Sequence, residues 1–444
     1  MRVFSLATLA AALLCGSSAA VAGPGTLSQE GTQPSTYAGD SSPGTILLVR
    51  PLTDPASPNR VTGSAIFSVR DNGFGLRQLT PFADDVYNLP DAWFQPFDSL
   101  ESWVGNAFSP SGRYSQFLKA HTREATVNHP FASGKYFIMN AWGQRTPPLF
   151  PGGNDLQLPK DGPSYGWLTW GPAGTDLIAY SNSVNGTPRR NACVRLMHPD
   201  GHGKRTLWCA PSSYPNKQAI EGLRWSGNGR FLLAYVEVTA PDNPNQTIDT
   251  RLFRINLNVG SAQLVHNDVT SPLHGAAADL SYDGDKVVFQ TNSPGACAPQ
   301  EQDQHVLCVR TLSTGQLVPL VDLDRTLVLS GGQLLLTPDG SHAVVNGGSR
   351  ISNAIELYVI KTDGTQLRRL TVPCRPLDPN GNIAVYWHPV RLSPDGKRVL
   401  ANCYSEQGSP RIRYPTQIYV VDIKTASARY VIDGYAYDWH VPAI

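Results

Sequence analysis

Short apolar runs separated by polar turns recur along the chain, and each turn carries a glycine at the same place. The clearest copies read RLSPDGKRVL (391–400) and LLTPDGSHAVV (335–345), and related ones read DLSYDGDKVVF (279–289) and RWSGNGRFLL (224–233). An apolar or aromatic residue lies four positions before each glycine, and an apolar run follows it. Pro presets φ early in such a turn, and Gly supplies the positive φ that closes a hairpin. Each copy therefore predicts a strand, a tight turn and a second strand.

The turn repeats with a regular spacing. Its glycines are Gly112, Gly174, Gly229, Gly284, Gly340 and Gly396, at intervals of 62, 55, 55, 56 and 56 residues. A second hairpin follows about twenty residues later in each unit, as in IYVVDIKTASARYVI (418–432) and LYVIKTDGTQLRRLT (357–371). Four strands per repeated unit predict an all-β chain folded as a β-propeller, since each sheet buries its faces only against its neighbours.

Strands from the two ends of the chain are expected to form the last of the sheets, which are called blades in a propeller. There are seven second hairpins, the first at 65–80, but only six first hairpins. We expect AYDWHV (436–441), which matches VYWHPV (385–390) through its Trp-His pair, to supply the missing strand and to pair with TILLVR (45–50). The expected fold is a seven-bladed propeller of four-stranded antiparallel blades over residues 44–444, closed by N- and C-terminal strands. Six blades are the alternative.

These repeat residues resemble the TolB-type (WD40-like) β-propeller repeat family. Its signature is an apolar residue, Ser-Pro-Asp-Gly-Lys and a short strand, later followed by Ile-Tyr-Val-Val-Asp. The best copies lie at 336–345 and 392–400, and the repeat covers most of the chain. What the resemblance implies is the propeller architecture.

The N-terminus has the pattern of a targeting segment. Arg2 precedes an apolar run and Ala20-Val21-Ala22 matches a cleavage site, so residues 1–22 are interpreted as a signal peptide. Residues 23–43 form an expected flexible leader rich in Gly, Ser, Pro and Thr. No later segment reaches 18 consecutive apolar residues, so we expect no membrane span. The expected location is periplasmic or extracellular.

The charge balance argues against one class of partner, and the cysteines indicate disulfides. Without Arg2 the chain has 35 basic and 35 acidic residues, because the whole chain has 36 and 35, and this balance argues against a nucleic-acid partner. Six of the seven cysteines remain after residues 1–22, which contain Cys15, are removed, and an even number in an exported chain indicates disulfides. No C-x-x-C spacing occurs, so neither a metal nor a redox cofactor is expected. Proximity predicts the pairs Cys193–Cys209, Cys297–Cys308 and Cys374–Cys403.

Loop length distinguishes the two edges of the blades. The turns within the hairpins are uniformly short, such as SPDG and TDGT, whereas the other connections are long and varied. Long loops on a rigid scaffold usually carry binding sites. We therefore expect binding on the face formed by the loops 81–102, 121–134, 144–166, 238–250 and 404–416.

The first strand of each unit should start on that face, around a central funnel. Counted back from the repeat glycine, Arg224, Asp279 and Arg391 lie at position −5. The other candidate funnel residues are Glu221 and His388 at position −8, Tyr165 and Trp103 at −9, His274 at −10, and His440, matched to His388. The alternative interpretation is that these residues are solvated or paired channel residues of an ordinary propeller.

Two functions fit these patterns. The first is an exported, non-enzymatic scaffold that binds a protein or cell-envelope component through its long-loop face, where aromatic residues and Arg411, Arg413 and Tyr414 would contribute. The second is a polysaccharide (uronate) lyase or other carbohydrate-active enzyme with an oligosaccharide ligand. In a lyase, His388 or His440 would remove a proton while Arg391 and Arg224 neutralise the adjacent carboxylate.

Overall fold

The chain divides into two compact units, residues 1–38 and 39–444. The fold is that of a computed structural model. The structure describes residues 44–54, 57–79, 109, 112, 114–121, 133–140, 168–172, 175, 177–181, 192–198, 201–213, 215–243, 246–269, 278–291, 297, 306–320, 327–349, 355–370, 374, 385–405 and 416–440. The predicted signal peptide, the leader and several long loops lie outside these residues.

The described residues form strands and turns without a helix, so the all-β prediction is confirmed. None of them belongs to a helix long and apolar enough to cross a membrane. Three sheets each contain four strands that are consecutive in the sequence. They are β6 (Leu168–Trp170), β7 (Ile178–Ser181), β8 (Cys193–Met197) and β9 (Arg205–Cys209); β10 (Lys217–Trp225), β11 (Phe231–Thr239), β12 (Thr247–Asn256) and β13 (Ala262–Asn267); and β14 (Ala278–Leu280), β15 (Lys286–Thr291), β16 (Val306–Thr311) and β17 (Leu317–Leu320).

The C-terminal part of the chain continues this pattern of four-stranded groups. Two further groups of four strands are joined into one sheet by a parallel bridge between Ile355 and Tyr386. They are β18 (Leu327–Leu336), β19 (His342–Ser349), β20 (Ile355–Lys361) and β21 (Arg368–Arg369), then β22 (Val385–Leu392), β23 (Arg398–Ser405), β24 (Gln417–Asp422) and β25 (Ala428–Asp433). A two-stranded sheet contains β4 (Tyr114–His121) and β5 (Ser133–Asn140).

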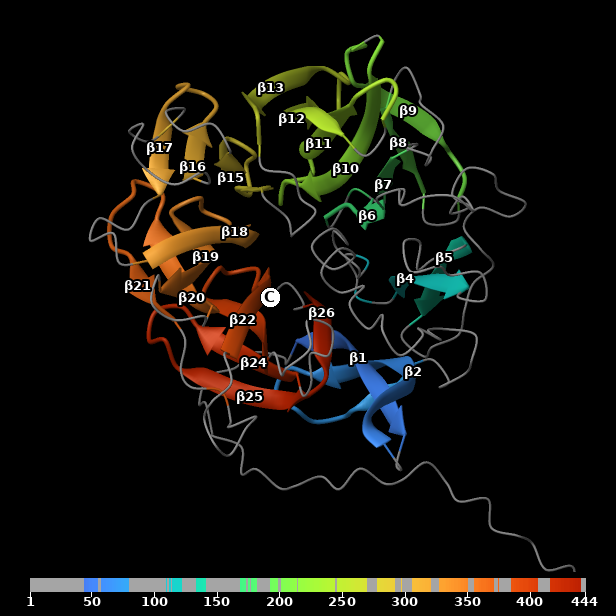
Figure 1. Cartoon of the computed structure of the whole chain (residues 1–444), viewed down its shortest axis with the longest axis vertical. Coiled ribbons are helices and arrows are strands. Elements are labelled where there is room, and N and C mark those ends of the chain that lie inside the picture. Colours follow the sequence, from blue (N-terminus) through green and yellow to red (C-terminus); the bar gives the residue numbers. More distant parts are fainter. Residues whose placement is uncertain are drawn as a thin grey trace, which may run out of the picture. The chain divides into compact units, whose positions relative to one another are not determined.

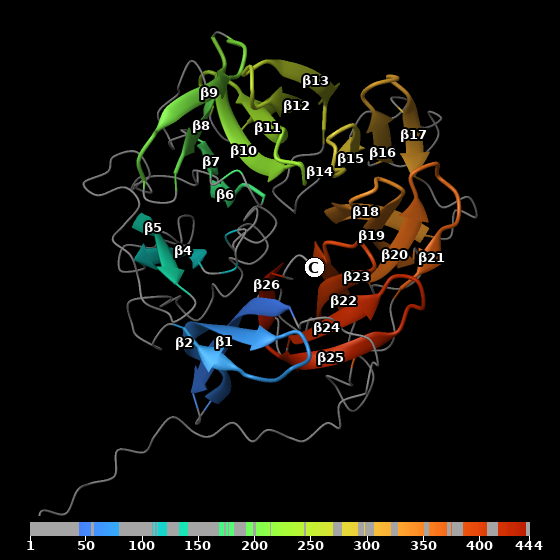
Figure 2. The same cartoon turned by 180° about the vertical axis from the view of Figure 1, so that it is seen from behind.

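The last strand pairs with the first. β26 (Tyr435–His440) runs antiparallel to β1 (Thr45–Asp54), which continues into β2 (Ser57–Arg70) and β3 (Arg77–Gln78). Figures 1 and 2 show the red β26 beside the blue β1 from opposite sides. The first strands of successive sheets also contact one another, β6 with β10, β10 with β14, β14 with β18, β18 with β22, and β22 with β26. The arrangement is propeller-like, and the blade number stays a prediction.

The register of β26 corrects one alignment made from the sequence. Leu47 faces Asp438 and Ile46 faces Trp439, as Leu400 faces Arg391 and Val399 faces Leu392 in the preceding sheet. Asp438 and Trp439 are therefore the counterparts of Arg391 and Leu392, at positions −5 and −4. The match of His440 with His388 is wrong, because it was drawn from the Trp-His pair and not from strand pairing. His440 lies instead at position −3.

The repeat turn is held by its own side chains. Ser393 Oγ donates to Asp395 Oδ1 (2.6 Å), and the backbone N–H groups of Lys397 and Arg398 donate to Asp395 and to Ser393 Oγ. The same bonds recur at Ser281–Asp283, where the serine hydrogen bond lowers the pKa of the Asp283 carboxyl. The Ser-x-Asp-Gly pattern thus closes a hairpin locally.

The glycine of the turn also contacts the sheet before it. Gly284 has φ +74°, and a Cβ there would lie 2.6 Å from Cδ2 of Phe231 in the preceding unit. Likewise, Gly229 lies against Thr175, Gly340 against Lys286, and Gly396 against Pro338. Each glycine is needed both for backbone conformation and for the approach of two sheets.

Buried apolar residues fill the spaces between sheets. One cluster joins β7 to β16, and another brings Ile46 and Ala65 together with Leu400, Ile418 and Trp439. The second cluster includes strands from both ends of the chain, so apolar burial as well as strand pairing joins the termini.

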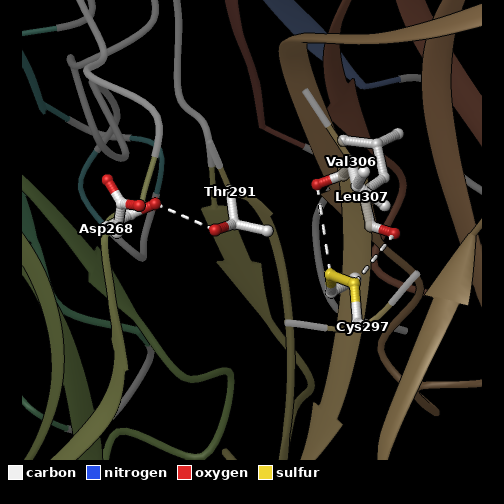
Figure 3. Close-up of a disulfide and its surroundings, with 6 residues drawn as sticks. Asp268, Thr291, Cys297, Val306 and Leu307 are labelled. Atoms are coloured by element: carbon white, nitrogen blue, oxygen red, sulfur yellow. Dashed lines mark hydrogen bonds between the residues drawn. A yellow bond between two sulfur atoms is a disulfide. The ribbon is translucent and has the colours of Figure 1, made fainter. Parts of the chain in front are cut away.

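The three disulfides join Cys193 to Cys209, Cys297 to Cys308, and Cys374 to Cys403, the pairs that proximity predicts. In Figure 3, Cys297 lies beside β16, with its sulfur 4.0 Å from the Leu307 carbonyl oxygen. Nearby, Thr291 Oγ1 donates to the carbonyl oxygen of Asp268, which follows β13 (2.9 Å). Bonds of both kinds therefore fix the end of β15 and the start of β16.

A buried asparagine joins β23 to the C-terminal strand. Asn402, with no exposed surface, donates through Nδ2 to the Ala436 carbonyl (3.0 Å) and accepts through Oδ1 from the Ala436 N–H (2.8 Å). Its counterpart one unit earlier is Asn346, also six residues after the repeat glycine and 4% exposed. The counterpart of Ala436 is then Pro389, which has no N–H, and Asn346 Oδ1 has no hydrogen-bond partner in the described part of the chain.

Replacing the glycine of a repeat turn should cost more than replacing the glycine of an outer turn. Gly315 has φ +72° but open space around it, so Gly315→Ala should cost only the left-handed backbone strain, about 1–2 kcal/mol. Gly284→Ala adds the collision with Phe231 and should cost about 1–3 kcal/mol more. Urea unfolding of both variants measures the difference. Equal losses would contradict a role for Gly284 in sheet-to-sheet packing.

The two asparagines should likewise differ. Asn402→Ala leaves the Ala436 N–H and carbonyl without this partner and should lower the free energy of unfolding by about 2–4 kcal/mol. Asn346→Ala removes an acceptor that has no described donor, so its cost should be smaller by about 1 kcal/mol or more. Equilibrium unfolding of the pair provides the comparison, and an equal or larger loss for Asn346→Ala would refute this account.

Candidate functional site

Position −5 of the first strands carries a group of charged side chains. The sequence predicts Arg224 on β10, Asp279 on β14 and Arg391 on β22, and the strand register adds Asp438 on β26. Each of the two arginines interacts electrostatically with Asp279, and Arg224 also interacts with Arg391 and Asp438. Strands from four sheets therefore bring alternating charges together. We call these four residues, with His440, the charged cluster.

The sequence analysis missed Asp438 because no repeat glycine follows the last strand, so its residues could not be numbered by counting back from one. A signal for it was present, since Trp170 and Trp225 occupy position −4 in two other units and Trp439 does so here. Aligning Trp439 with those tryptophans would have placed Asp438 at position −5.

The best-defined contact in the cluster is an ion pair. Arg391 Nε lies 3.5 Å from Asp438 Oδ1, with side-chain exposures of 31% and 5%. Asp438 Oδ1 also accepts the Trp439 N–H (2.8 Å), so the carboxylate is held by its own strand as well. The arginine is the accessible partner of the pair.

The second acid of the cluster joins two sheets. Asp279 Oδ2 accepts the N–H of Leu336, the last residue of β18 (2.9 Å). Burial raises the pKa of Asp279, and the attraction of Arg224 opposes that rise. Burial also lowers the pKa of Arg224, while Asp279 and Asp438 oppose and Arg391 adds to the effect. Because both residues keep partial exposure, they are surrounded by protein yet remain in reach of solvent.

His440 lies beside this pair. Burial lowers its pKa, Arg391 lowers it further, and Asp438 acts in the opposite direction. The imidazole is therefore neutral at pH 7. Its ring packs against Gly112, where a Cβ would lie 2.3 Å from Cδ2 of the ring. A neutral imidazole next to a guanidinium can accept or donate a proton.

The structure describes only some of the other predicted funnel residues. His388 lies on β22, half-buried, opposite Asn402. Glu221 lies in β10 at a register irregularity, and its side chain is outside the described part of the structure. Trp103, Tyr165 and His274 lie outside the described residues. A role in binding stays a prediction for all nine funnel residues, the four of earlier paragraphs (Arg224, Asp279, Arg391 and His440) included.

No metal site can be assigned in the described part of the chain, which contains no group of three or more His, Cys, Asp or Glu side chains placed to hold one ion.

Comparison with known proteins gives a likeness of fold. No family model matches the chain, and no curated protein matches it. A prolyl endopeptidase structure has a TM-score of 0.52 at 12% identity over 90% of this chain and 51% of its own, so this chain spans about half its length. Oligogalacturonate lyase from Vibrio parahaemolyticus has a TM-score of 0.49 at 12% identity over 88% and 87% of the two chains.

TolB from Acinetobacter baumannii has a TM-score of 0.37 at 15% identity, over 72% of this chain and 62% of its own. Identities this low concern the fold alone and specify no activity. The chain is thus an all-β protein of several antiparallel sheets with propeller-like neighbours among solved structures.

Proposed function

We propose that this protein is an exported β-propeller of TolB type that binds a protein or cell-envelope component through its long-loop edge. The observation that carries the proposal is the use of the opposite edge for contacts between sheets. Asn228 N–H donates to the Tyr282 carbonyl and Tyr282 N–H donates to the Pro338 carbonyl, so the repeat turns of three units are bonded in series. The edge with long, varied loops is then the one left for a partner.

The charges of the cluster support a scaffold. Arg391 forms an ion pair with Asp438, and Asp279 attracts Arg224, so the two acids and two bases compensate one another. Compensated charges hold neighbouring sheets without requiring a substrate. The proposal includes seven blades closed by β26 and β1, export through residues 1–22, and a propeller over residues 44–444. The three disulfides fit an oxidising compartment.

Capture with a matched control tests this function. Residues 23–444 are immobilised and exposed to cell-envelope extract, beside a loop variant carrying Arg411→Ala, Arg413→Ala and Tyr414→Ala. If these residues are interface hot spots, retention of the enriched partner should fall at least about tenfold, since arginine and tyrosine dominate such sites.

The control variant, Arg230→Ala with Lys424→Ala, removes two exposed charges from the short turns and should retain the partner. No enrichment by the parent chain, or equal loss in both variants, would rule out binding through the long-loop edge.

A uronate lyase is the second candidate, favoured by the neutral His440 beside Arg391. In β-elimination, a base removes the proton next to the substrate carboxylate, the adjacent C–O bond breaks, a C=C bond forms, and the leaving oxygen is protonated. His440 would serve as the base and Arg391 would neutralise the carboxylate. Since the pKa of His440 is lowered, it would stay unprotonated below the ordinary histidine range.

Unsaturated products absorb in the ultraviolet, which gives a direct assay on a panel of uronate oligosaccharides. If the protein is a lyase, the parent chain should be active and His440→Ala inactive, and His388→Ala should lose activity if that residue assists. His198→Ala, which changes an exposed histidine of an outer turn, should keep full activity. A panel without product would eliminate this candidate and leave the scaffold proposal unaffected.

A further inference from the structure

Arg391 has more hydrogen-bonding capacity than its surroundings use. Its Nε faces Asp438 at 3.5 Å, which is its one ion pair in the described part of the chain, and Asp279 attracts it from farther away. A guanidinium has five N–H donors in a planar fork, four of them on the two terminal nitrogens. The Arg391 side chain is 31% exposed, so it can be reached by an acceptor from solution.

The acids of the cluster are engaged by comparison. Asp438 Oδ1 accepts from the Trp439 N–H and pairs with Arg391, and Asp279 Oδ2 accepts from the Leu336 N–H. Each carboxylate thus accepts a backbone hydrogen bond and is also attracted to an arginine. Asp438 is 5% exposed and Arg391 31%, so the more accessible partner of this pair is the donor.

The net charge of the cluster limits the kind of ligand. Two arginines and two aspartates sum to zero, and His440 is neutral. Arg224 and Arg391 repel each other, so one negative charge placed near both is favourable. A dianion would bring its second charge close to Asp279 and Asp438. A planar monoanion that accepts two parallel N–H bonds fits best, and a carboxylate has this form.

We propose that Arg391, with Arg224 behind it, is a binding site for one carboxylate group of a small acid. The terminal nitrogens of Arg391 donate two bonds to the carboxylate, the Nε stays with Asp438, and His440 contacts the acid from the same strand as Asp438. This site goes beyond the proposed scaffold function because it requires no captured partner. It uses the same Arg391 as the lyase candidate but requires no turnover.

Paired acid and neutral probes test the proposal by NMR titration of residues 23–444. D-glucuronate should bind and its methyl ester should bind at least about tenfold more weakly, because the ester has lost the charge. Acetate distinguishes the sources: binding comparable to glucuronate means that the carboxylate alone suffices, and weaker binding means that a sugar acid is preferred. Either result supports a carboxylate site.

Substitutions locate the site. Arg391→Gln should weaken glucuronate binding at least about tenfold, and Arg391→Lys, which keeps the charge but not the fork, should fall between. The control is Arg369→Gln, which breaks the surface pair with Glu356 and should bind like the parent. Thermal unfolding verifies that each variant is folded.

Asp438→Asn provides a second readout if Arg391→Gln does not fold. It removes the competing negative charge and should tighten glucuronate binding several-fold. Equal binding of the acid and its ester, or no binding of either, would overturn the proposal. Partner capture by the long loops would be unchanged in those cases, so failure of this site and failure of the scaffold function can be distinguished.

Discussion

Most of the architecture depends on the close contact between a repeat turn and the sheet before it. The turn needs a residue with positive φ, and the neighbouring sheet leaves no space for a side chain at that residue, as at Gly284 and Phe231. Because the same contact recurs at Gly229, Gly340 and Gly396, each unit is positioned by the one before it. The contact between turns also orients the first strands, and this orientation brings their position −5 side chains together. The charged cluster therefore depends on how the repeat turns pack at the short-turn edge of the sheets.

Within that frame, position −5 is where the repeat varies in charge. The sheets fix where each residue lies, and the sequence changes only what it is: Arg224, Asp279, Arg391 and Asp438 alternate in sign, with Leu335 at the same position on β18. Burial makes each charge costly unless another one compensates it. The near-neutral sum allows four ionisable groups to lie close together, and Arg391, 31% exposed, is the one through which we propose that a ligand binds.

Much of this could be predicted from the sequence, and the failures have physical causes. The glycine interval predicts strands, turns and their order, because a tight turn is determined by a few adjacent residues. Arg224, Asp279 and Arg391 follow from counting back from that glycine. Asp438 could not be placed in this way, because no repeat turn follows the last strand. Its position in the repeat is known only from the pairing with β1, more than 380 residues away in sequence. The clamp of Asn402 on Ala436 was equally invisible, since it joins side chain to backbone across two sheets.

The pairing of β26 with β1 also has a consequence for how the protein is made. β1 is among the first strands to be synthesised, and its partner β26 among the last, so one edge of the first sheet lacks its partner until the whole repeat has been produced. An unpaired edge readily joins the wrong strand, in the same chain or in another. Truncation before Tyr435 would remove the strand that pairs with β1 and would leave that edge of the first sheet open.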